Sequence, residues 1–398
     1  MFPHEAPPLG RLLMEIWAPG IWVFMTSLLL SLLATPVFRW VAKRFGIVDQ
    51  PDHAVKIHAR PIPYLGGCAI WLAWTVPMVV HLVFGHPGHV WAELMLIVGG
   101  VVAFGTGLVD DLLDIPPKWK LFGQAVAGAI LLVGGIMWFA YPALGFFPFD
   151  LPQNSWFVLV VCVGMHFFVV LGVTNATNLL DGLDGLCSGV TAIIAVGFLM
   201  LATSLTAYYL YGTGLKYEYT TLIMLVAFAL AGAAIGFLPY NFNPARIFMG
   251  DAGSIFVGYV LAAMMIMFAS KFGMVKWFVG ALFIFGLPIF DTAMALIRRV
   301  SNRRPVMMPD CSHLYNQLVD RLGLTVRQTV GVSYGLSVLF AVLGLLVVYE
   351  GIRGRWAAGM YLVLGVGFLV IVWLLGFFQM TPEEKAAADR YLARKGRA

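Results

Sequence analysis

Long apolar stretches recur along almost the whole chain and are separated by short polar segments. Each stretch approaches the roughly 20 residues that an α-helix needs to cross a bilayer. This pattern predicts eleven spans, at 20–38, 65–84, 93–109, 121–140, 156–173, 186–208, 220–238, 255–270, 277–297, 328–349 and 357–378. The eighth is short, and the ninth contains Pro288. The predicted fold is therefore all-α, a polytopic membrane protein with a single domain over 1–398.

Composition excludes the two main classes of non-membrane chain. Of 398 residues, 61% are hydrophobic and 11% are charged, whereas soluble domains carry about 25% charged residues. The chain is also too apolar to be disordered. Its four cysteines lack the spacing of a metal or redox site and are expected to be small buried hydrophobic residues.

The positive charges predict orientation instead of a nucleic-acid partner. If the segment after the first span is cytosolic, 19 lysines and arginines fall on the cytosolic side and 6 on the other. Cytosolic loops are enriched in these residues, so the N-terminus is expected outside and the C-terminus in the cytosol. The predicted cytosolic segments are 39–64, 110–120, 174–185, 239–254, 298–327 and 379–398.

The unusual polar clusters all fall on the predicted cytosolic side. In the first, prolines and the Gly66-Gly67 pair indicate an extended segment that bends into the second span. Lys56, His58 and Arg60 in this segment either contact phosphate or are ordinary positive-inside residues.

Adjacent carboxylates close the third span. Asp110 and Asp111 repel each other and are costly to desolvate at the end of an apolar helix. Asp114 follows three and four residues later, on the same expected helical face. The pattern favours cation binding over a solvated helix end.

Two further cytosolic segments carry acids beside glycines. Asn178, Asp181 and Asp184 recur every three residues, which would stack them on one side of a helical turn. The segment 250–254 reads Gly-Asp-Ala-Gly-Ser and precedes a span. It is either an N-cap with flexible flanks or a phosphate site whose Asp251 holds a cation.

The longest cytosolic loop, 298–327, contains four closely spaced arginines and His313. The arginines suit a polyphosphate or simply record orientation, and His313 is either a structural residue or a ligand contact. Carboxylates, basic side chains and glycine turns on one face together indicate a Mg²⁺–diphosphate site, since Mg²⁺ prefers oxygen ligands and substrate phosphates.

These motifs resemble those of the polyprenyl-phosphate N-acetylhexosamine-1-phosphate transferases, the WecA, TagO and MraY types. The matching segments are 49–67, Asp110-Asp111-x-x-Asp114, Asn178-x-x-Asp181-Gly-x-Asp184-Gly and Met249-Gly-Asp251-x-Gly-Ser254. The first loop and the loop after span nine look closer to the WecA/TagO branch. The chain departs from that branch at its His-x-His-His string, which here reads His313-Leu314-Tyr315-Asn316.

The resemblance implies transfer of N-acetylhexosamine 1-phosphate from UDP-N-acetylglucosamine, or a related UDP-sugar, to undecaprenyl or another polyprenyl phosphate, releasing UMP. It also implies Mg²⁺, with Mn²⁺ as a substitute ion, and a place in the bacterial cytoplasmic membrane at the start of cell-envelope glycan synthesis. A homodimer is expected by analogy alone. An MraY-type reaction, a UbiA-like prenyltransferase and a secondary transporter are the alternatives.

Residue roles follow from the same resemblance. The expected catalytic residues are Asp110, Asp111, Asp181, Asp184 and His313. The expected substrate-binding residues are Lys56, His58, Arg60, Asn178, Gly250, Gly253, Ser254, Arg303 and Arg304. The expected metal ligands are Asp111 and Asp251.

Overall fold

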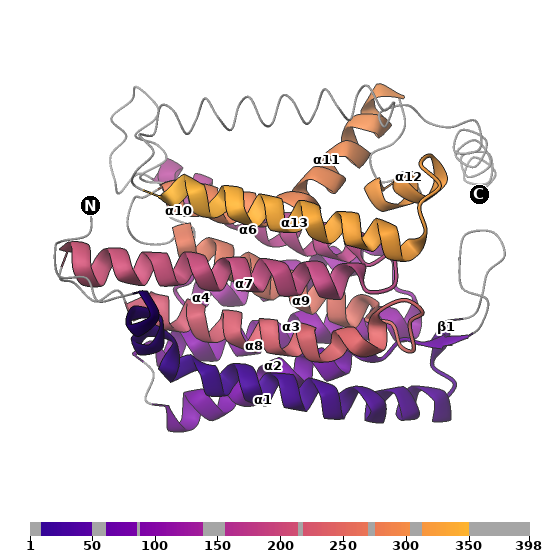
Figure 1. Ribbon diagram of the computed structural model, residues 1–398, viewed down its shortest axis with the longest axis horizontal. Helices are drawn as coiled ribbons and strands as arrows, with labels where there is room; N and C mark the ends of the chain where they lie inside the picture. Colours follow the sequence, from indigo (N-terminus) through magenta and orange to yellow (C-terminus); the bar gives the residue numbers. More distant parts are fainter. Residues whose placement is uncertain are drawn as a thin grey trace.

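The structure, a computed structural model, describes residues 9–49, 61–85, 88–137, 156–213, 218–269, 275–302 and 313–349. Long helices run side by side as a bundle (Figure 1). The helices are α1 (Leu9–Arg44), α2 (Gly66–Phe84), α3 (Val90–Leu113), α4 (Pro117–Val133), α6 (Trp156–Leu180), α7 (Leu186–Ala207), the π-helical turn η1 (Tyr208–Thr213), α8 (Glu218–Asn241), α9 (Gly250–Ala269), α10 (Val275–Ile284), α11 (Gly286–Ser301), α12 (Leu314–Asp320) and α13 (Val326–Val348). Two short strands, β1 (Val48–Asp49) and β2 (Ile62–Pro63), pair antiparallel.

The helices confirm the prediction of an all-α polytopic membrane protein. Within the described ranges, eight helices are long and apolar enough to cross a membrane, or nine if a bent pair counts as one span. The 17-residue α4 overlaps the predicted fourth span, 121–140, but ends at Val133 and is not among these eight. The predicted span at 357–378 lies outside the described residues, so the total of eleven and the orientation of the termini stay predictions.

The predicted ninth span is not one continuous helix. It is divided into α10 and α11, whose axes differ by 73°, and α11 rises steeply away from the bundle in Figure 1. The break lies at Phe285, and Pro288 is the third residue of α11. N–H groups in a first turn have no intrahelical acceptor, so proline is tolerated there but not in a helix interior. The prediction of one continuous span was wrong because this proline lies in the first turn of a new helix.

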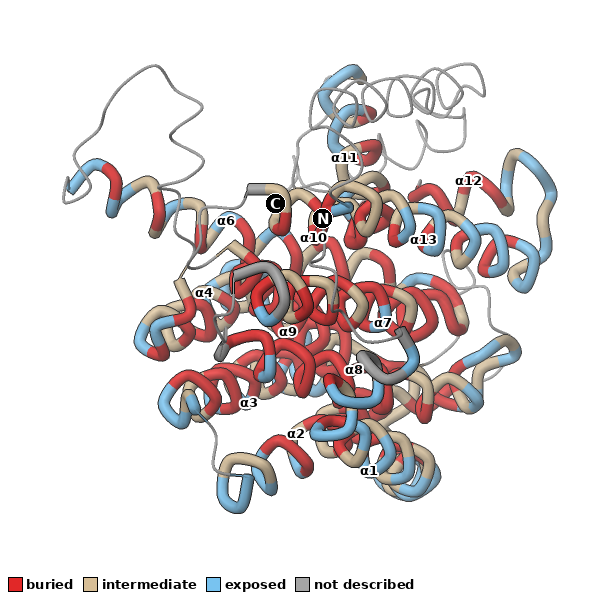
Figure 2. Tube along the Cα trace, turned by 60° about the vertical axis from the view of Figure 1, so that its left-hand side comes forward, coloured by how far each residue is buried: buried red, intermediate tan, exposed pale blue. Residues whose placement is uncertain are grey.

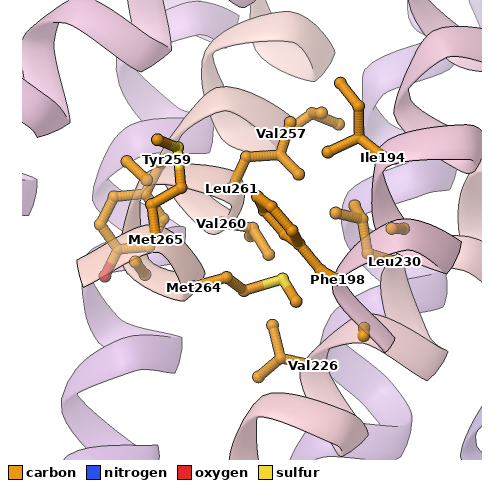
Figure 3. Close-up of a cluster of buried hydrophobic side chains, with 14 of the residues drawn as sticks. Ile194, Phe198, Val226, Leu230, Val257, Tyr259, Val260, Leu261, Met264 and Met265 are labelled. Carbon is orange, nitrogen blue, oxygen red and sulfur yellow. The ribbon is translucent and has the colours of Figure 1, made fainter. Parts of the chain in front are cut away.

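Helix α9 forms the centre of the bundle. Every residue from Ala252 to Phe268 is buried, and Figure 2 shows α9 in red among its neighbours. A helix that is apolar on all sides is surrounded either by lipid or by protein, and the burial of all these positions shows that protein surrounds α9. Figure 3 shows Val260 and Met264 of α9 close to Phe198 of α7 and Leu230 of α8. Between helices in a membrane, such close packing supplies the attraction, because lipid is as apolar as the side chains.

Glycines set how closely two neighbours approach α9. A Cβ added at Gly107 of α3 would lie 2.2 Å from the Asp251 carbonyl oxygen, and one at Gly258 of α9 would lie 2.6 Å from Thr174 Cα of α6. Small residues permit such backbone contacts between membrane helices. The polar ends of α3, α6 and α9 are therefore held together at one place.

The predicted burial of the cysteines is confirmed for the three that the structure describes. Cys68, Cys162 and Cys187 are free and buried, whereas Cys311 lies outside the described residues.

Candidate functional site

Asp111 caps the central helix. Its Oδ1 accepts a hydrogen bond from the Asp251 N–H at 2.8 Å, and its Oδ2 accepts one from the Ala252 N–H at 2.9 Å. Gly250 precedes them with a φ of 71°, and a Cβ there would come within 2.6 Å of Asp111 Oδ2. The positive end of α9 thus binds a carboxylate of the chain itself. The N–H groups of Asp251 and Ala252 at this helix end are therefore already occupied by Asp111.

Asp110 and Asp251 converge on one ammonium group, that of Lys120 in the first turn of α4. Lys120 Nζ lies 2.5 Å from Asp110 Oδ2 and also forms an ion pair with Asp251 Oδ2. Asp110 is buried, and its Oδ1 accepts the Ile115 N–H at 3.2 Å. Sequence reasoning missed Lys120 because a single lysine beside a span has the signature of any positive-inside residue.

Asn178 links α6 to the same acid. Its Nδ2 donates to Asp251 Oδ1 at 2.8 Å and to Ser254 Oγ at 2.9 Å. Ser254 is fully buried and donates to the Gly250 carbonyl at 3.1 Å, while Gly253 packs against Gly67 of α2. Packing accounts for Ser254 and Gly253 without a ligand, and their contact with substrate stays a prediction.

Asp181 follows the last residue of α6 and is only partly exposed. Burial is the largest cause that raises its pKa, to about 8 from 3.8, and the nearby carboxylates of Asp251, Asp111 and Asp184 raise it further. The smaller part of this shift, the part due to Asp251, Asp111 and Asp184, reflects several acids gathered in one small region. Such a region attracts cations.

Asp184 has a different environment from the one expected. Its Oδ2 accepts hydrogen bonds from Asn243 Nδ2 and the Ala245 N–H, both at 2.9 Å. The predicted stacking of Asn178, Asp181 and Asp184 is wrong because α6 ends at Leu180, which leaves the last acid in a turn. Asp184 therefore holds the loop before α9.

Asp114 also departs from its expected position. It terminates α3 in a left-handed conformation with a φ of 48° and is exposed. The prediction that it shares a helical face with Asp110 and Asp111 is wrong, since the helix ends one residue earlier, at Leu113.

His313 is buried and immediately precedes α12. Its Nδ1 lies 2.8 Å from Asp291 Oδ2 of α11, and Asp291 Oδ1 accepts the Leu314 N–H at 2.6 Å. Tyr315 stacks on the imidazole and donates a hydrogen bond to the Leu179 carbonyl at 3.3 Å. His313 is therefore connected to the α6 end that carries Asp181. Sequence reasoning missed Asp291, which lies inside an expected span.

The remaining predicted substrate contacts lie outside the described residues. They are Lys56, His58, Arg60, Arg303 and Arg304.

The donor set suits Mg²⁺. No group of three or more His, Cys, Asp or Glu side chains is placed to share a metal ion among the described residues. Mg²⁺ commonly takes only one or two carboxylates, with waters and substrate phosphates completing its shell. Asp110 and Asp251 already converge on a cation, the Lys120 ammonium. The pair therefore fits a divalent ion that also contacts phosphate.

Known proteins are similar in sequence to this chain over most of its length. Residues 93–269 match the model of glycosyl transferase family 4. The probable undecaprenyl-phosphate N-acetylglucosaminyl 1-phosphate transferase of Bacillus subtilis is 31% identical over 321 residues, covering 80% of this chain and 82% of that protein. The decaprenyl-phosphate N-acetylglucosaminephosphotransferase of Mycobacterium tuberculosis is 31% identical, covering 78% of each chain. The undecaprenyl-phosphate alpha-N-acetylglucosaminyl 1-phosphate transferase of Escherichia coli K12 is 27% identical, covering 89% of each.

Proposed function

Since this chain belongs to glycosyl transferase family 4, we propose that it transfers N-acetylglucosamine 1-phosphate from UDP-N-acetylglucosamine to a polyprenyl phosphate and releases UMP. The observation that carries the proposal is the convergence of Asp110, Asp251 and Lys120 at the ends of three helices. Transporters tend to place ionisable groups near the bilayer midplane, so acids gathered at helix ends favour an enzyme.

The proposed reaction is an in-line displacement at phosphorus. An oxygen of the lipid phosphate attacks the β-phosphorus of the UDP-sugar, and the bond from that phosphorus to the bridging oxygen breaks as UMP leaves. A phosphate monoester with a second pKa of about 6 is mostly dianionic at neutral pH. The acceptor therefore needs placement more than deprotonation, and Asp110 is the proposed group that positions it or takes a remaining proton.

Asp251 is the proposed ligand of Mg²⁺, which would neutralise the diphosphate and the departing UMP when bound. Asp111 is a less suitable ligand than the sequence suggested, because both its oxygens already accept N–H groups of α9. Lys120 lies where the Asp110 and Asp251 carboxylates meet. When a bound cation neutralises these carboxylates, the Lys120 ammonium is available to the diphosphate.

The proposed orientation places this site in the cytosol, at the inner face of a bacterial membrane. The 19-to-6 distribution of lysines and arginines supports it. UDP-sugars are water-soluble and polyprenyl phosphates are membrane-bound, so a site at the ends of membrane helices gives both substrates access.

The test is a transfer assay with purified protein in lipid nanodiscs. Undecaprenyl phosphate is supplied with labelled UDP-N-acetylglucosamine, UDP-N-acetylgalactosamine or UDP-N-acetylmuramoyl-pentapeptide, with Mg²⁺ or with excess chelator. We expect label in the organic phase with UDP-N-acetylglucosamine and Mg²⁺, together with an equal amount of UMP. Transfer from none of the donors would refute the function, and transfer from the muramoyl donor alone would favour the MraY-type reaction.

Two further outcomes test the parts of the mechanism separately. Unimpaired transfer in excess chelator would eliminate the metal. An Asp110→Asn variant with wild-type turnover from neutral to mildly acidic pH would eliminate Asp110 as a base.

A further inference from the structure

The described part of the chain holds two pairs of a histidine and a buried carboxylate, at different places in the bundle. One joins His81 of α2 to Glu93 of α3 through Nδ1–Oε distances of 2.9 and 3.1 Å. The other joins His313 to Asp291. About 17 residues of α3 separate Glu93 from Asp110, which is roughly 25 Å along a helix. Only the His313 pair lies close to the acidic cluster.

Asp291 contacts both the side chain of His313 and the backbone that follows it. Its two oxygens accept from His313 Nδ1 and from the Leu314 N–H, at 2.8 and 2.6 Å. Both His313 and Asp291 are at least 95% buried. A carboxylate accepts hydrogen bonds and donates none, so the hydrogen must be on Nδ1. The nitrogen that Asp291 does not contact is Nε2.

The ring is held on a second side by Tyr315. The two rings are stacked, with centroids 5.5 Å apart and an interplanar angle of 8°. The Tyr315 hydroxyl reaches the Leu179 carbonyl, and a Cβ at Gly182 would lie 1.9 Å from that hydroxyl. The imidazole is therefore fixed relative to the turn that carries Asp181. In Figure 1 α12 lies beside α13, apart from the steep α11, so the Asp291 carboxylate joins two separate elements.

We propose that Asp291 is a positioning residue for catalysis, which fixes the tautomer and orientation of His313 so that Nε2 contacts the sugar-diphosphate donor. This inference rests on the proposed function. A carboxylate behind a histidine commonly determines which ring nitrogen is available to a ligand. The alternative is a structural role, in which the buried Asp291 carboxylate stabilises the start of the seven-residue helix α12.

The informative variant is Asp291→Asn. His313 Nδ1 and the Leu314 N–H contact different oxygens of Asp291. In the same orientation, the NH₂ group of Asn replaces one of these oxygens, so only one of the two donors keeps its acceptor. Either the imidazole moves its hydrogen to Nε2 or the start of α12 loses its partner. Asp291→Glu keeps two acceptors and serves as the conservative variant. Glu93→Gln removes the charge from the remote pair, in which both carboxylate oxygens contact His81 Nδ1, and is the control for loss of a buried carboxylate.

The first measurement is ¹⁵N NMR of histidine-labelled protein in nanodiscs, with His313→Gln identifying the signal among eight histidines. We expect hydrogen on Nδ1 of His313 in the wild type and a changed signal in Asp291→Asn. A wild-type His313 with its hydrogen on Nε2 alone would overturn the proposal. This measurement needs no turnover, so it decides the positioning even if the transferase assay fails.

The second measurement is the kcat and KM for UDP-N-acetylglucosamine. We expect Asp291→Asn to lose at least about tenfold in kcat/KM, within the range seen when such supporting partners are removed. Asp291→Glu should recover part of that loss, and Glu93→Gln should stay within about threefold of wild type. Asp291→Asn within twofold of wild type would refute the proposal. So would an equal loss in Glu93→Gln, because it would assign the effect to stability.

Discussion

Replacing Gly107 with alanine should separate α3 from α9 at the site. The added Cβ would lie 2.2 Å from the Asp251 carbonyl oxygen, 2.5 Å from its carbon and 2.6 Å from Ala252 Cα. All three atoms belong to the backbone of α9, so no side chain can rotate to make room. The two helices must move apart.

The size of the movement follows from these distances. Ordinary van der Waals contact begins at 3.4 Å, so the closest pair must separate by about 1.2 Å if α9 moves along the line of contact. Overpacking of this kind typically costs about 1–3 kcal/mol of stability. Asp110 and Asp111 lie one turn beyond Gly107, and a misplacement of about 1 Å at reacting groups can lower the rate about 100-fold. We expect a variant that folds but loses about two orders of magnitude in turnover.

The assay compares Gly107→Ala with Gly105→Ala, two residues earlier in α3. A Cβ at Gly105 has nothing within 4 Å, so this control carries the same chemical change without the contact. Turnover is measured by label transfer, and stability by thermal unfolding in one detergent. If Gly107→Ala and Gly105→Ala were equally active and equally stable, the close approach of α3 to α9 would not position the site.

Three further predictions concern the neighbouring contacts. Lys120→Met should lower kcat by about 100-fold or more, because a missing site cation commonly costs several kcal/mol of transition-state stabilisation; Lys118→Met, with Lys118 stacked over a neighbouring tryptophan ring, is the control, and equal kcat values would contradict the prediction. Gly182→Ala should lower kcat, because its added Cβ would lie 1.9 Å from the Tyr315 hydroxyl and must displace that side chain. Adding Tyr315→Ala should recover part of the activity, and no recovery would mean that the clash is not the cause. The pKa of Asp181 is about 8 in the folded chain and 3.8 ordinarily, so the wild type loses stability as its carboxyl group deprotonates with rising pH up to the folded pKa. Asn carries no titrating proton, so in chelator Asp181→Asn should gain thermal stability relative to wild type between pH 5 and 8.5. A difference in melting temperature that stayed constant over this range would refute the raised pKa.

The architecture was largely accessible from the sequence. Nine of the eleven predicted spans correspond to described helices long and apolar enough to cross a membrane, counting the bent pair, and the shorter α4 overlaps a tenth. A span is specified by local apolar length alone. The exception in shape is the ninth span. The sequence analysis predicted one helix with Pro288 in its interior, whereas in the structure a new helix, α11, begins at Gly286, two residues before this proline. A proline signals an interruption, but the sequence does not say whether it follows or precedes the break.

The site was only partly accessible, because its residues meet through contacts between distant segments. Repulsion between Asp110 and Asp111 marks them as unusual from their sequence neighbours alone. Nothing near Lys120 in the sequence indicates that it meets Asp251, 131 residues away. Likewise, Asp184 looked equivalent to Asp181 in spacing, yet only the folded loop at Asn243 shows which of the two is bound by backbone and amide donors.

The cap that Asp111 provides for α9 has an energetic consequence for ligand binding. Gathering several acids in one place is unfavourable, and in many sites the arriving cation must overcome that repulsion. Here the positive end of a helix stabilises one of the acids as the chain folds. The acidic cluster is thus preorganised before any substrate arrives, and less of the binding free energy is spent on assembling it. Weakening the start of α9 would consequently reduce affinity for the cation and the diphosphate, even if every ligand side chain were kept.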